Sequence, residues 1–255
     1  MTKSNKSLER EPAVMPRRQI LTIGASLATA GVLGTWYYTL RNPPPARTGA
    51  APRRARGRLS MSELPKPGPL PEIVVGKEDA PVTIVEYADL TCPACANFHT
   101  NTLPTIKEKY IDTGKVRLFF REFPTNTPAI VAFMAVRCLP ADKAPPLISA
   151  LFARQEEWRG AASFDQLRDT LFSFGQQVGL TRAAFDTCVP VPKAGKVDLT
   201  PHQQKLAQDI SSVRDRGHDG FGVSATPTFF INGKRLSGNS VEDFDRALAP
   251  LLNPS

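Results

Sequence analysis

The stretch VTIVEYADLTCPAC occupies residues 82–95 and decides the fold. Its first part, residues 82–87, is a run of β-branched and apolar residues that predicts a buried strand. Asp89 and a Cys-Pro-Ala-Cys sequence at residues 92–95 follow directly. This order predicts a strand that delivers two cysteines to the start of a helix.

Cys92 is the predicted nucleophile of this motif. The free N–H groups and the dipole at a helix N-terminus favour a thiolate over a thiol. Two cysteines separated by Pro93 and Ala94 are also spaced to close a small disulfide loop. The sequence therefore predicts a redox-active Cys92–Cys95 pair.

The positive charge of the chain is concentrated at one end. The 255 residues carry a formal net charge of +8 at pH 7. Residues 1–71 hold 12 Lys and Arg against three Asp and Glu, whereas residues 72–255 hold 20 against 21. Because the predicted globular part is nearly neutral, we expect it to have no nucleic-acid-binding surface.

Residues 1–40 predict membrane targeting. Residues 1–19 are polar and basic, and residues 20–40 contain no charged side chain. A helix needs about 20 apolar residues to span a bilayer, so the second segment is long enough. We expect membrane contact through residues 20–40 and a folded domain outside the cytoplasm, in the periplasm or its equivalent, where disulfides persist.

A cleaved signal and an uncleaved anchor are the two alternatives for this segment. The sequence RRQIL at residues 17–21 resembles a twin-arginine export signal, and ATA at residues 28–30 fits a signal-peptidase site. The aromatic residues WYY at 36–38 instead suit a membrane interface and favour an anchor that is retained.

Residues 41–71 predict a linker. They contain eight prolines, with Gly, Ala and Arg between them and few apolar side chains. Such a composition favours an extended, disordered Pro/Arg-rich segment over a packed domain. The folded domain is therefore expected to cover residues 72–255, which is enough chain for one well-buried core.

The predicted elements of this domain begin with a strand–helix–strand unit. After the first strand, residues 96–112 predict a helix that Pro104 kinks, and residues 116–120 predict a second buried strand parallel to the first. Residues 127–217 have a helical pattern throughout, with Ser163, Thr181 and Thr200 as candidate N-caps.

The last elements complete a known order. Residues 227–231 predict a third strand, Asn232-Gly233 predicts a hairpin turn into residues 234–236, and residues 241–252 predict a closing helix. Strand–helix–strand, a helical insertion at about 127–217, then a hairpin and a helix is the thioredoxin order. The predicted fold class is therefore α/β, a thioredoxin fold with an inserted helical subdomain.

Three segments carry a family resemblance. They are EYADLTCPAC at residues 86–95, VRLFFREFP at residues 116–124 and GVSATPTFFING at residues 222–233. Together they are similar to the corresponding segments of DsbA-like thiol-disulfide oxidoreductases, and the similarity covers about residues 72–252.

The resemblance implies a role for five residues. Cys92 exchanges disulfides with the substrate, and Cys95 resolves the mixed disulfide. Pro227 is implied to be a cis-proline against the redox pair, with the backbone of Thr226 free to pair with a substrate chain. Glu86 is implied to be a buried acid that moves the proton of Cys95. The alternative for Glu86 is an exposed residue at a strand end.

Ala94 is the departure from the family pattern. The strong oxidants of the family carry His at this position, where its charge or N–H stabilises the thiolate. Because Ala supplies neither, we expect a weaker oxidant than DsbA.

Cys138 and Cys188 lie on two predicted helices of the insertion. An even number of cysteines in an oxidising compartment favours a structural disulfide between them, and similar family members bond this pair. Two free buried thiols are the alternative. Because no histidine is spaced to complete a zinc site with them, we expect no metal, and the resemblance implies no cofactor.

His99 follows Cys95 by four residues and Cys92 by seven, so it lies on the same helical face as both. It either tunes Cys95 or is a packed or surface residue, and we expect the second. His218 precedes Asp219-Gly220 and predicts only a turn.

The sequence thus predicts an extracytoplasmic thiol-disulfide oxidoreductase that introduces disulfides into exported proteins. Its partners would be cysteine-containing exported substrates and a membrane redox protein that recycles it. A disulfide reductase or isomerase is the first alternative, although residues 41–71 are too poor in apolar groups for a dimerisation module. A non-catalytic, chaperone-like binding module is the second, although binding alone needs no pair of thiols.

Overall fold

The computed structural model of the chain describes residues 59–193 and 195–252. Five strands in this part form one sheet in the order β1-β3-β2-β4-β5. They are β1 (Ile73–Val75), β2 (Val82–Ala88), β3 (Val116–Glu122), β4 (Thr228–Ile231) and β5 (Lys234–Arg235). β2 and β3 pair in parallel, and the other neighbouring pairs are antiparallel. The predicted parallel unit and the thioredoxin-type fold are confirmed.

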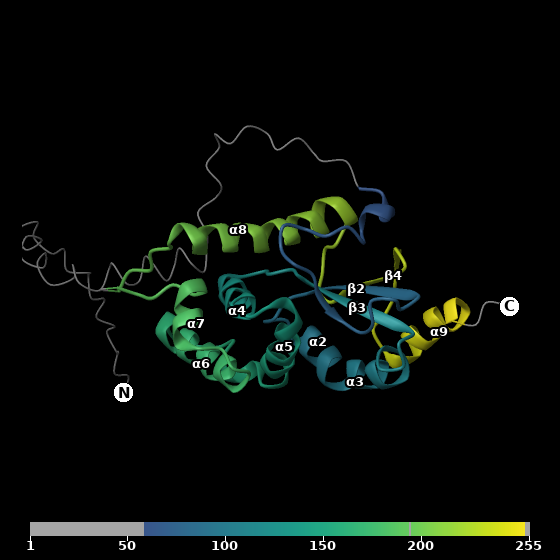
Figure 1. Cartoon of the computed structure of the whole chain (residues 1–255), viewed down its shortest axis with the longest axis horizontal. Helices are drawn as coiled ribbons and strands as arrows, with labels where there is room; N and C mark the ends of the chain where they lie inside the picture. Colours follow the sequence, from purple (N-terminus) through teal and green to yellow (C-terminus); the bar gives the residue numbers. More distant parts are fainter. Residues whose placement is uncertain (1–58, 194, 253–255) are drawn as a thin grey trace, which may run out of the picture. The chain divides into compact units, whose positions relative to one another are not determined.

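Helices cover both faces of this sheet (Figure 1). α8 packs against β3 and α4, α9 packs against β2 and α3, and the helices α4 to α7 pack on one another. The helices are α2 (Pro93–Asn97), α3 (Leu103–Ile106), α4 (Thr127–Arg137), α5 (Ala144–Ala153), α6 (Phe164–Gln177), α7 (Arg182–Cys188), α8 (Pro201–Asp215) and α9 (Val241–Leu252).

The alternation of side chains along β2 determines which core each residue joins. Ile84 packs in the apolar cluster that contains α3 and α9, whereas Val85 and Tyr87 pack in the cluster that contains residues of α8. Successive strand residues point to opposite faces, so Glu86 lies on the face of Ile84. Both faces are covered, which explains why β2 is apolar almost throughout.

The helix predicted over residues 96–112 is present but interrupted. α2 continues into a wide helical turn over Phe98–Thr102, α3 follows, and a second wide turn covers Lys107–Ile111. Pro104 lies in the first turn of α3, where its missing N–H leaves no intrahelical bond unmade. Pro104 therefore lies at the start of a new helical segment, where the sequence predicted a kink within one helix.

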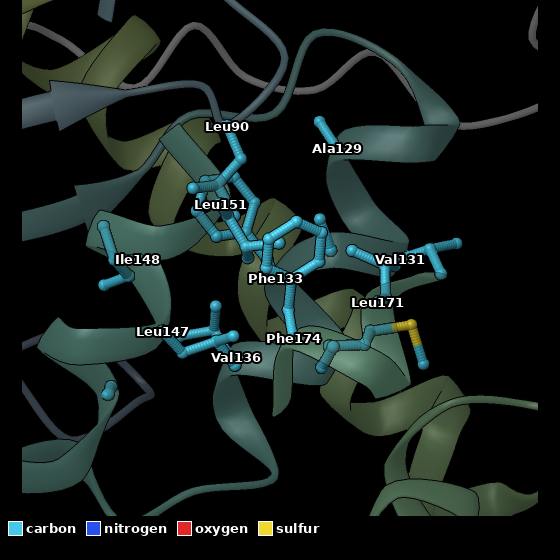
Figure 2. Close-up of a cluster of buried hydrophobic side chains, with 14 of the residues drawn as sticks. Leu90, Ala129, Val131, Phe133, Val136, Leu147, Ile148, Leu151, Leu171 and Phe174 are labelled. Carbon is cyan, nitrogen blue, oxygen red and sulfur yellow. The ribbon is translucent and has the colours of Figure 1, made fainter. Parts of the chain in front are cut away.

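The helical insertion has its own apolar core (Figure 2). Phe133 and Val136 of α4 meet Leu147 and Leu151 of α5, and Phe174 of α6 closes the cluster. All five side chains are buried. The insertion therefore packs as a subdomain rather than as a set of loops.

Three helices of the insertion begin at the predicted capping residues. The hydroxyls of Ser163, Thr181 and Thr200 each accept a hydrogen bond from the backbone N–H three residues further on. At Thr200 the side-chain oxygen of Gln203 also accepts a hydrogen bond from the backbone N–H of Thr200, which completes a capping box.

The predicted hairpin joins β4 to β5. Asn232 and Gly233 have φ angles of 43° and 82°, a region that Asn and Gly adopt most readily. The side-chain oxygen of Asn232 accepts a hydrogen bond from the backbone N–H of Thr83 at 2.8 Å. The turn is thereby tied to β2.

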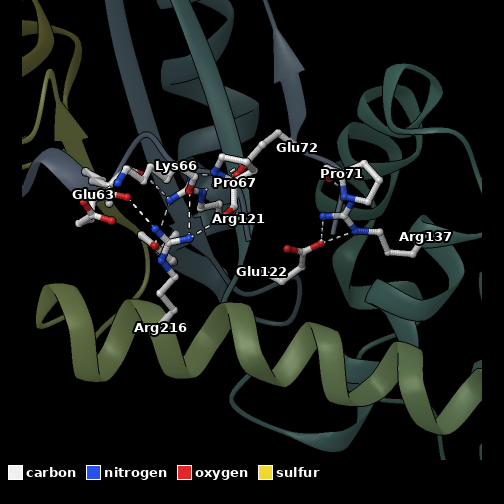
Figure 3. A network of polar contacts seen from close by, with 11 residues as sticks. Glu63, Lys66, Pro67, Pro71, Glu72, Arg121, Glu122, Arg137 and Arg216 are labelled. Carbon is white, nitrogen blue, oxygen red and sulfur yellow. Dashed lines mark hydrogen bonds and ion pairs between the residues drawn. The ribbon is translucent and has the colours of Figure 1, made fainter. Parts of the chain in front are cut away.

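The sequence predicts a disordered linker up to residue 71, but residues 59–71 pack on the domain. The side chain of Leu64 is buried in the cluster under β2. Arg121, Arg137 and Arg216 donate hydrogen bonds to backbone carbonyls of this segment (Figure 3). The accepting carbonyls are those of Glu63, Leu64, Lys66, Pro67 and Pro71. The linker prediction is therefore wrong for residues 59–71.

The predicted basic segment at 1–19, the apolar segment at 20–40 and the linker up to residue 58 lie outside the described residues. Within the part that the structure describes, no helix has the length and apolar character needed to cross a membrane.

Candidate active site

Cys92 stands at the N-cap of α2, in extended backbone, with Pro93 as the first residue of the helix. A hydrogen bond from the Cys95 thiol is the main cause that lowers the pKa of Cys92 to about 5. Partial burial opposes this shift, and the Thr226 side chain and the backbone N–H groups of Cys95 and Ala94 add to it. Cys92 is therefore ionised at neutral pH and partly accessible.

Cys95 has the opposite character. Its side chain is fully buried. Burial is the largest cause that raises the pKa of Cys95, followed by its hydrogen bond to Cys92 and by the negative charge of Glu86. The pair therefore divides into an ionised outer sulfur and a protonated inner one.

Thr226 and Pro227 lie opposite the first cysteine. The peptide bond between them is cis, and β4 begins at the next residue. In its protonated form, the Cys92 thiol donates to the carbonyl of Thr226, with 3.3 Å between the two atoms. The structure thus brings Thr226 to the redox pair although 134 residues separate them along the chain.

Glu86 lies in β2 with its side chain fully buried, so it is not an exposed residue at a strand end. The Nε2 atom of His99 is 3.0 Å from each of its carboxylate oxygens. The His99 side chain is itself only 5% exposed and stacks on Phe152 with 4.2 Å between the ring centroids. His99 is therefore a buried partner of the carboxylate rather than an incidental surface residue.

Asp89 organises the loop between β2 and α2, a role that the sequence did not reveal. Its side chain is buried, and its two oxygens accept hydrogen bonds from the backbone N–H and the hydroxyl of both Thr91 and Thr125. Its carbonyl also accepts from the backbone N–H of Cys92 at 3.0 Å. These bonds fix the backbone just before the helix.

Gln155 holds the same loop from the helical insertion. Its buried side-chain amide donates to the carbonyls of Leu90 at 2.7 Å and Cys92 at 3.0 Å. Nothing in the sequence near Gln155 indicates this contact, because its partners lie more than 60 residues earlier. The insertion thus helps to position the candidate nucleophile.

Cys138 and Cys188 lie near each other, and both are thiols in this structure. A hydrogen bond with Cys188 is the largest cause that raises the pKa of Cys138, and the same bond lowers the pKa of Cys188. The Cys138 thiol also donates to the carbonyl of Met134 at 3.3 Å. A disulfide between the two stays a prediction.

Metal ligands are not gathered in the described residues, which contain no group of three or more His, Cys, Asp or Glu able to hold an ion. His218 is exposed beside Asp219, 2.8 Å from its carboxylate.

Comparison with known proteins gives one matching family model, described as thioredoxin, over residues 70–249. The crystal structure of α-DsbA1 from Wolbachia pipientis is similar, with 28% identity and a TM-score of 0.62 over 76% of this chain and 96% of that one. Oxidised BdbD from Bacillus subtilis shares the fold, with 20% identity and a TM-score of 0.58 over 77% and 96% of the two chains.

A curated relative comes from Rickettsia bellii and is provisionally named a protein-disulfide oxidoreductase. It is 25% identical over 185 residues, which cover 72% of this chain and 66% of the relative. Other Rickettsia relatives of the same kind are covered over 60% to 62% of their length. The chain thus spans less than two thirds of these relatives.

Proposed function

Since this chain belongs to the DsbA-like family of thioredoxin-fold proteins, we propose that it is a thiol-disulfide oxidoreductase that introduces disulfides into exported proteins. One observation carries the proposal. The pKa of the partly exposed Cys92 is lowered to about 5, whereas that of the buried Cys95 is raised. These pKa values suit thiol-disulfide exchange. The ionised outer sulfur, Cys92, reacts with the substrate, and the protonated inner sulfur, Cys95, resolves the mixed disulfide.

The reaction starts from the Cys92–Cys95 disulfide. A substrate thiolate attacks Cys92, the Cys92–Cys95 bond breaks, and Cys95 leaves with the electron pair and takes up a proton. A second substrate thiolate then attacks the substrate sulfur of the mixed disulfide, and Cys92 leaves as a thiolate. The substrate gains a disulfide, and the enzyme gains two electrons and becomes the dithiol.

The low pKa of Cys92 supports the oxidising direction. A thiolate that is stabilised in the reduced protein makes the dithiol form more favourable, which raises the reduction potential of the pair. Ala94 is exposed and offers only its backbone N–H to Cys92. The expected potential therefore lies between those of thioredoxin, about −270 mV, and DsbA, about −120 mV.

The test is the glutathione redox equilibrium of the pair. A variant in which Cys138 and Cys188 are both replaced by Ala isolates the reaction of Cys92 and Cys95. A potential in the range between thioredoxin and DsbA supports the oxidase. A potential at or below that of thioredoxin would refute the oxidising direction and favour a reductase.

Cys92→Ser separates catalysis from binding. It should abolish both disulfide donation and insulin reduction, with the double Cys138→Ala, Cys188→Ala variant as the matched control that keeps them. A Cys92→Ser protein that still protects unfolded substrates from aggregation as well as wild type, while the wild type transfers no disulfides, would instead favour the chaperone-like module.

The setting of the reaction is part of the proposal. We propose that the domain works outside the cytoplasm, joined to the membrane or exported through residues 20–40, and that a membrane redox protein reoxidises the dithiol. In that compartment we also propose that Cys138 and Cys188 form a structural disulfide, which their shared hydrogen bond supports. Mass mapping of protein isolated without reductant from a cell envelope tests this pairing, and recovery of both as alkylated thiols would exclude it.

A further inference from the structure

We propose that His99 is a positioning residue that holds the Glu86 carboxylate ready to exchange a proton with Cys95. The inference rests on the thiol-disulfide exchange proposed above and deepens it. Neither the Cys-Pro-Ala-Cys motif nor the Thr-Pro segment includes this histidine. Its contact with Glu86 is a feature of the folded chain.

The geometry of the pair is symmetric. A single atom, Nε2 of His99, lies 3.0 Å from both Oε1 and Oε2 of Glu86. The imidazole therefore contacts both oxygens at once, and each oxygen keeps lone-pair directions that point away from the ring. One oxygen is free to accept a proton while the other retains the histidine bond.

The surroundings of His99 specify which nitrogen carries the proton. Among the described residues, the buried Nδ1 atom has no hydrogen-bond partner. The ring stacks on Phe152, and Phe120 and Phe98 approach it edge-on. Nε2 is therefore the ring nitrogen that faces the carboxylate, and Nδ1 faces the apolar cage. Because a carboxylate only accepts hydrogen bonds, Nε2 carries a proton and donates it to Glu86.

Cys95 is the group on which this carboxylate acts. The negative charge of Glu86 is one of the causes that raise the pKa of the Cys95 thiol, so the two side chains interact. When the Cys92–Cys95 bond breaks, Cys95 leaves with the electron pair and receives a proton from Glu86. In the reverse step, Cys95 returns that proton to Glu86 and its sulfur attacks Cys92, which expels the substrate thiolate. His99 keeps its hydrogen bond to the Glu86 carboxylate in both steps.

Few other charges face the pair. α2 presents the two cysteines, α5 presents Phe152, and the neighbouring strands present Phe120 and Phe229 at the register of Glu86. Two further carboxylates lie nearby. Glu122, two residues along β3, is ion-paired with Arg137, and Asp89, in the loop before Cys92, accepts hydrogen bonds from Thr91 and Thr125. The proton balance of the site therefore depends on Cys92, Cys95, Glu86 and His99.

The test follows the resolving step alone. The mixed disulfide of Cys92 with glutathione is prepared at acid pH, the pH is raised, and the release of glutathione by Cys95 is timed. His99→Phe keeps an aromatic ring but removes the donor, and His99→Gln offers an amide donor in its place. We expect release at pH 7 to slow by about 10-fold in His99→Phe, with its pH profile displaced to higher pH, and to recover in His99→Gln.

A double-variant comparison assigns the effect to the carboxylate. Glu86→Gln should slow release at least as much as His99→Phe, and combining the two should slow it no further than Glu86→Gln alone. A wild-type rate and pH profile in His99→Phe, or additive effects in the double variant, would overturn the proposal. Alkylation of Cys92 at pH 5.5 should be unchanged throughout, and slow alkylation in wild type would count against the proposed function instead.

A second measurement keeps the proposal testable if His99→Phe does not fold. The nitrogen NMR shifts of His99 in the reduced wild-type protein report its protonation directly. A ring with a hydrogen-bonded proton on Nε2 is expected at pH 7. A ring whose only proton lies on Nδ1 would refute the inference.

Discussion

The ionisation of Cys92 makes a quantitative prediction about its reactivity. With a pKa of about 5, Cys92 is about 99% thiolate at pH 7, whereas a peptide cysteine with a pKa of about 8.5 is about 3% ionised. Intrinsic nucleophilicity falls with pKa, with a Brønsted coefficient of about 0.4–0.5, which makes the less basic thiolate about 40-fold slower. The two effects nearly cancel at pH 7, so the alkylation rate at neutral pH would not distinguish Cys92 from an ordinary cysteine.

The difference becomes visible in acid. At pH 5.5 Cys92 is still about three quarters ionised, and the peptide thiol is only about 0.1% ionised. After the same correction for nucleophilicity, Cys92 should react with iodoacetamide about 20-fold faster than the peptide. Its rate should be half-maximal near pH 5 and level above about pH 6.5.

The assay is alkylation of the reduced protein across pH 4 to 9, with Cys92 quantified by peptide mass mapping. A rate that still rises between pH 7 and 9 would refute the reasoning, because it describes an ordinary cysteine. Cys95→Ala should move the midpoint upward, since the Cys95 hydrogen bond is the largest cause of the low pKa. Thr226→Val, which removes a smaller contribution, should move it less.

Four further predictions follow from the same structure. Because the pKa of Cys92 is depressed on folding, its contribution to stability is present above about pH 8.5 and lost as pH falls to about 5. In urea titrations the free energy of unfolding of the reduced protein should therefore fall over this range relative to the oxidised protein, by well under the limit of about 1.4 kcal/mol per pH unit because Cys92 is partly exposed and screened by solvent. Gln155→Leu leaves the Leu90 and Cys92 carbonyls without their donor and should cost about 1–3 kcal/mol by the same titrations, and no loss would show that this bond is absent in solution. Leu64→Ala should cost about 2–4 kcal/mol of unfolding free energy, and a negligible change would mean that residues 59–71 do not pack. Ala94→His should raise the potential in the glutathione equilibrium, and an unchanged or lower value would contradict the assigned role of that position.

The order of elements could be predicted because it depends on local signals. The apolar run at 82–87 became β2, the hydroxyl residues before three helices became their caps, and Asn232-Gly233 became the hairpin turn. The sequence did not predict β1, because its three residues form a strand by pairing with β3. A segment this short carries too little periodicity to be distinguished from a loop.

The linker shows how tertiary contacts override composition. Prolines and few apolar residues favour an extended, unpacked segment, and that inference was sound for an isolated chain. The folded domain supplies Arg121, Arg137 and Arg216, which bind the backbone of residues 59–71 through carbonyls that any sequence would have. Because these polar contacts are made to the backbone, and Leu64 is a single buried apolar residue, the segment has no residue pattern that indicates packing.

The same limit explains why the sequence did not indicate the contact between His99 and Glu86. Its spacing from Cys95 correctly indicates a shared helical face, but that face says nothing about what lies beneath it. The partner is Glu86, set by the alternation of β2 and by the register that places Phe120 and Phe229 on either side. Only in the folded chain do the imidazole, in the turn Phe98–Thr102, and the carboxylate of β2 meet among aromatic side chains. A residue whose function depends on such a meeting cannot be recognised from its own sequence neighbourhood, whereas the two cysteines, whose chemistry depends on a helix start next to them, can.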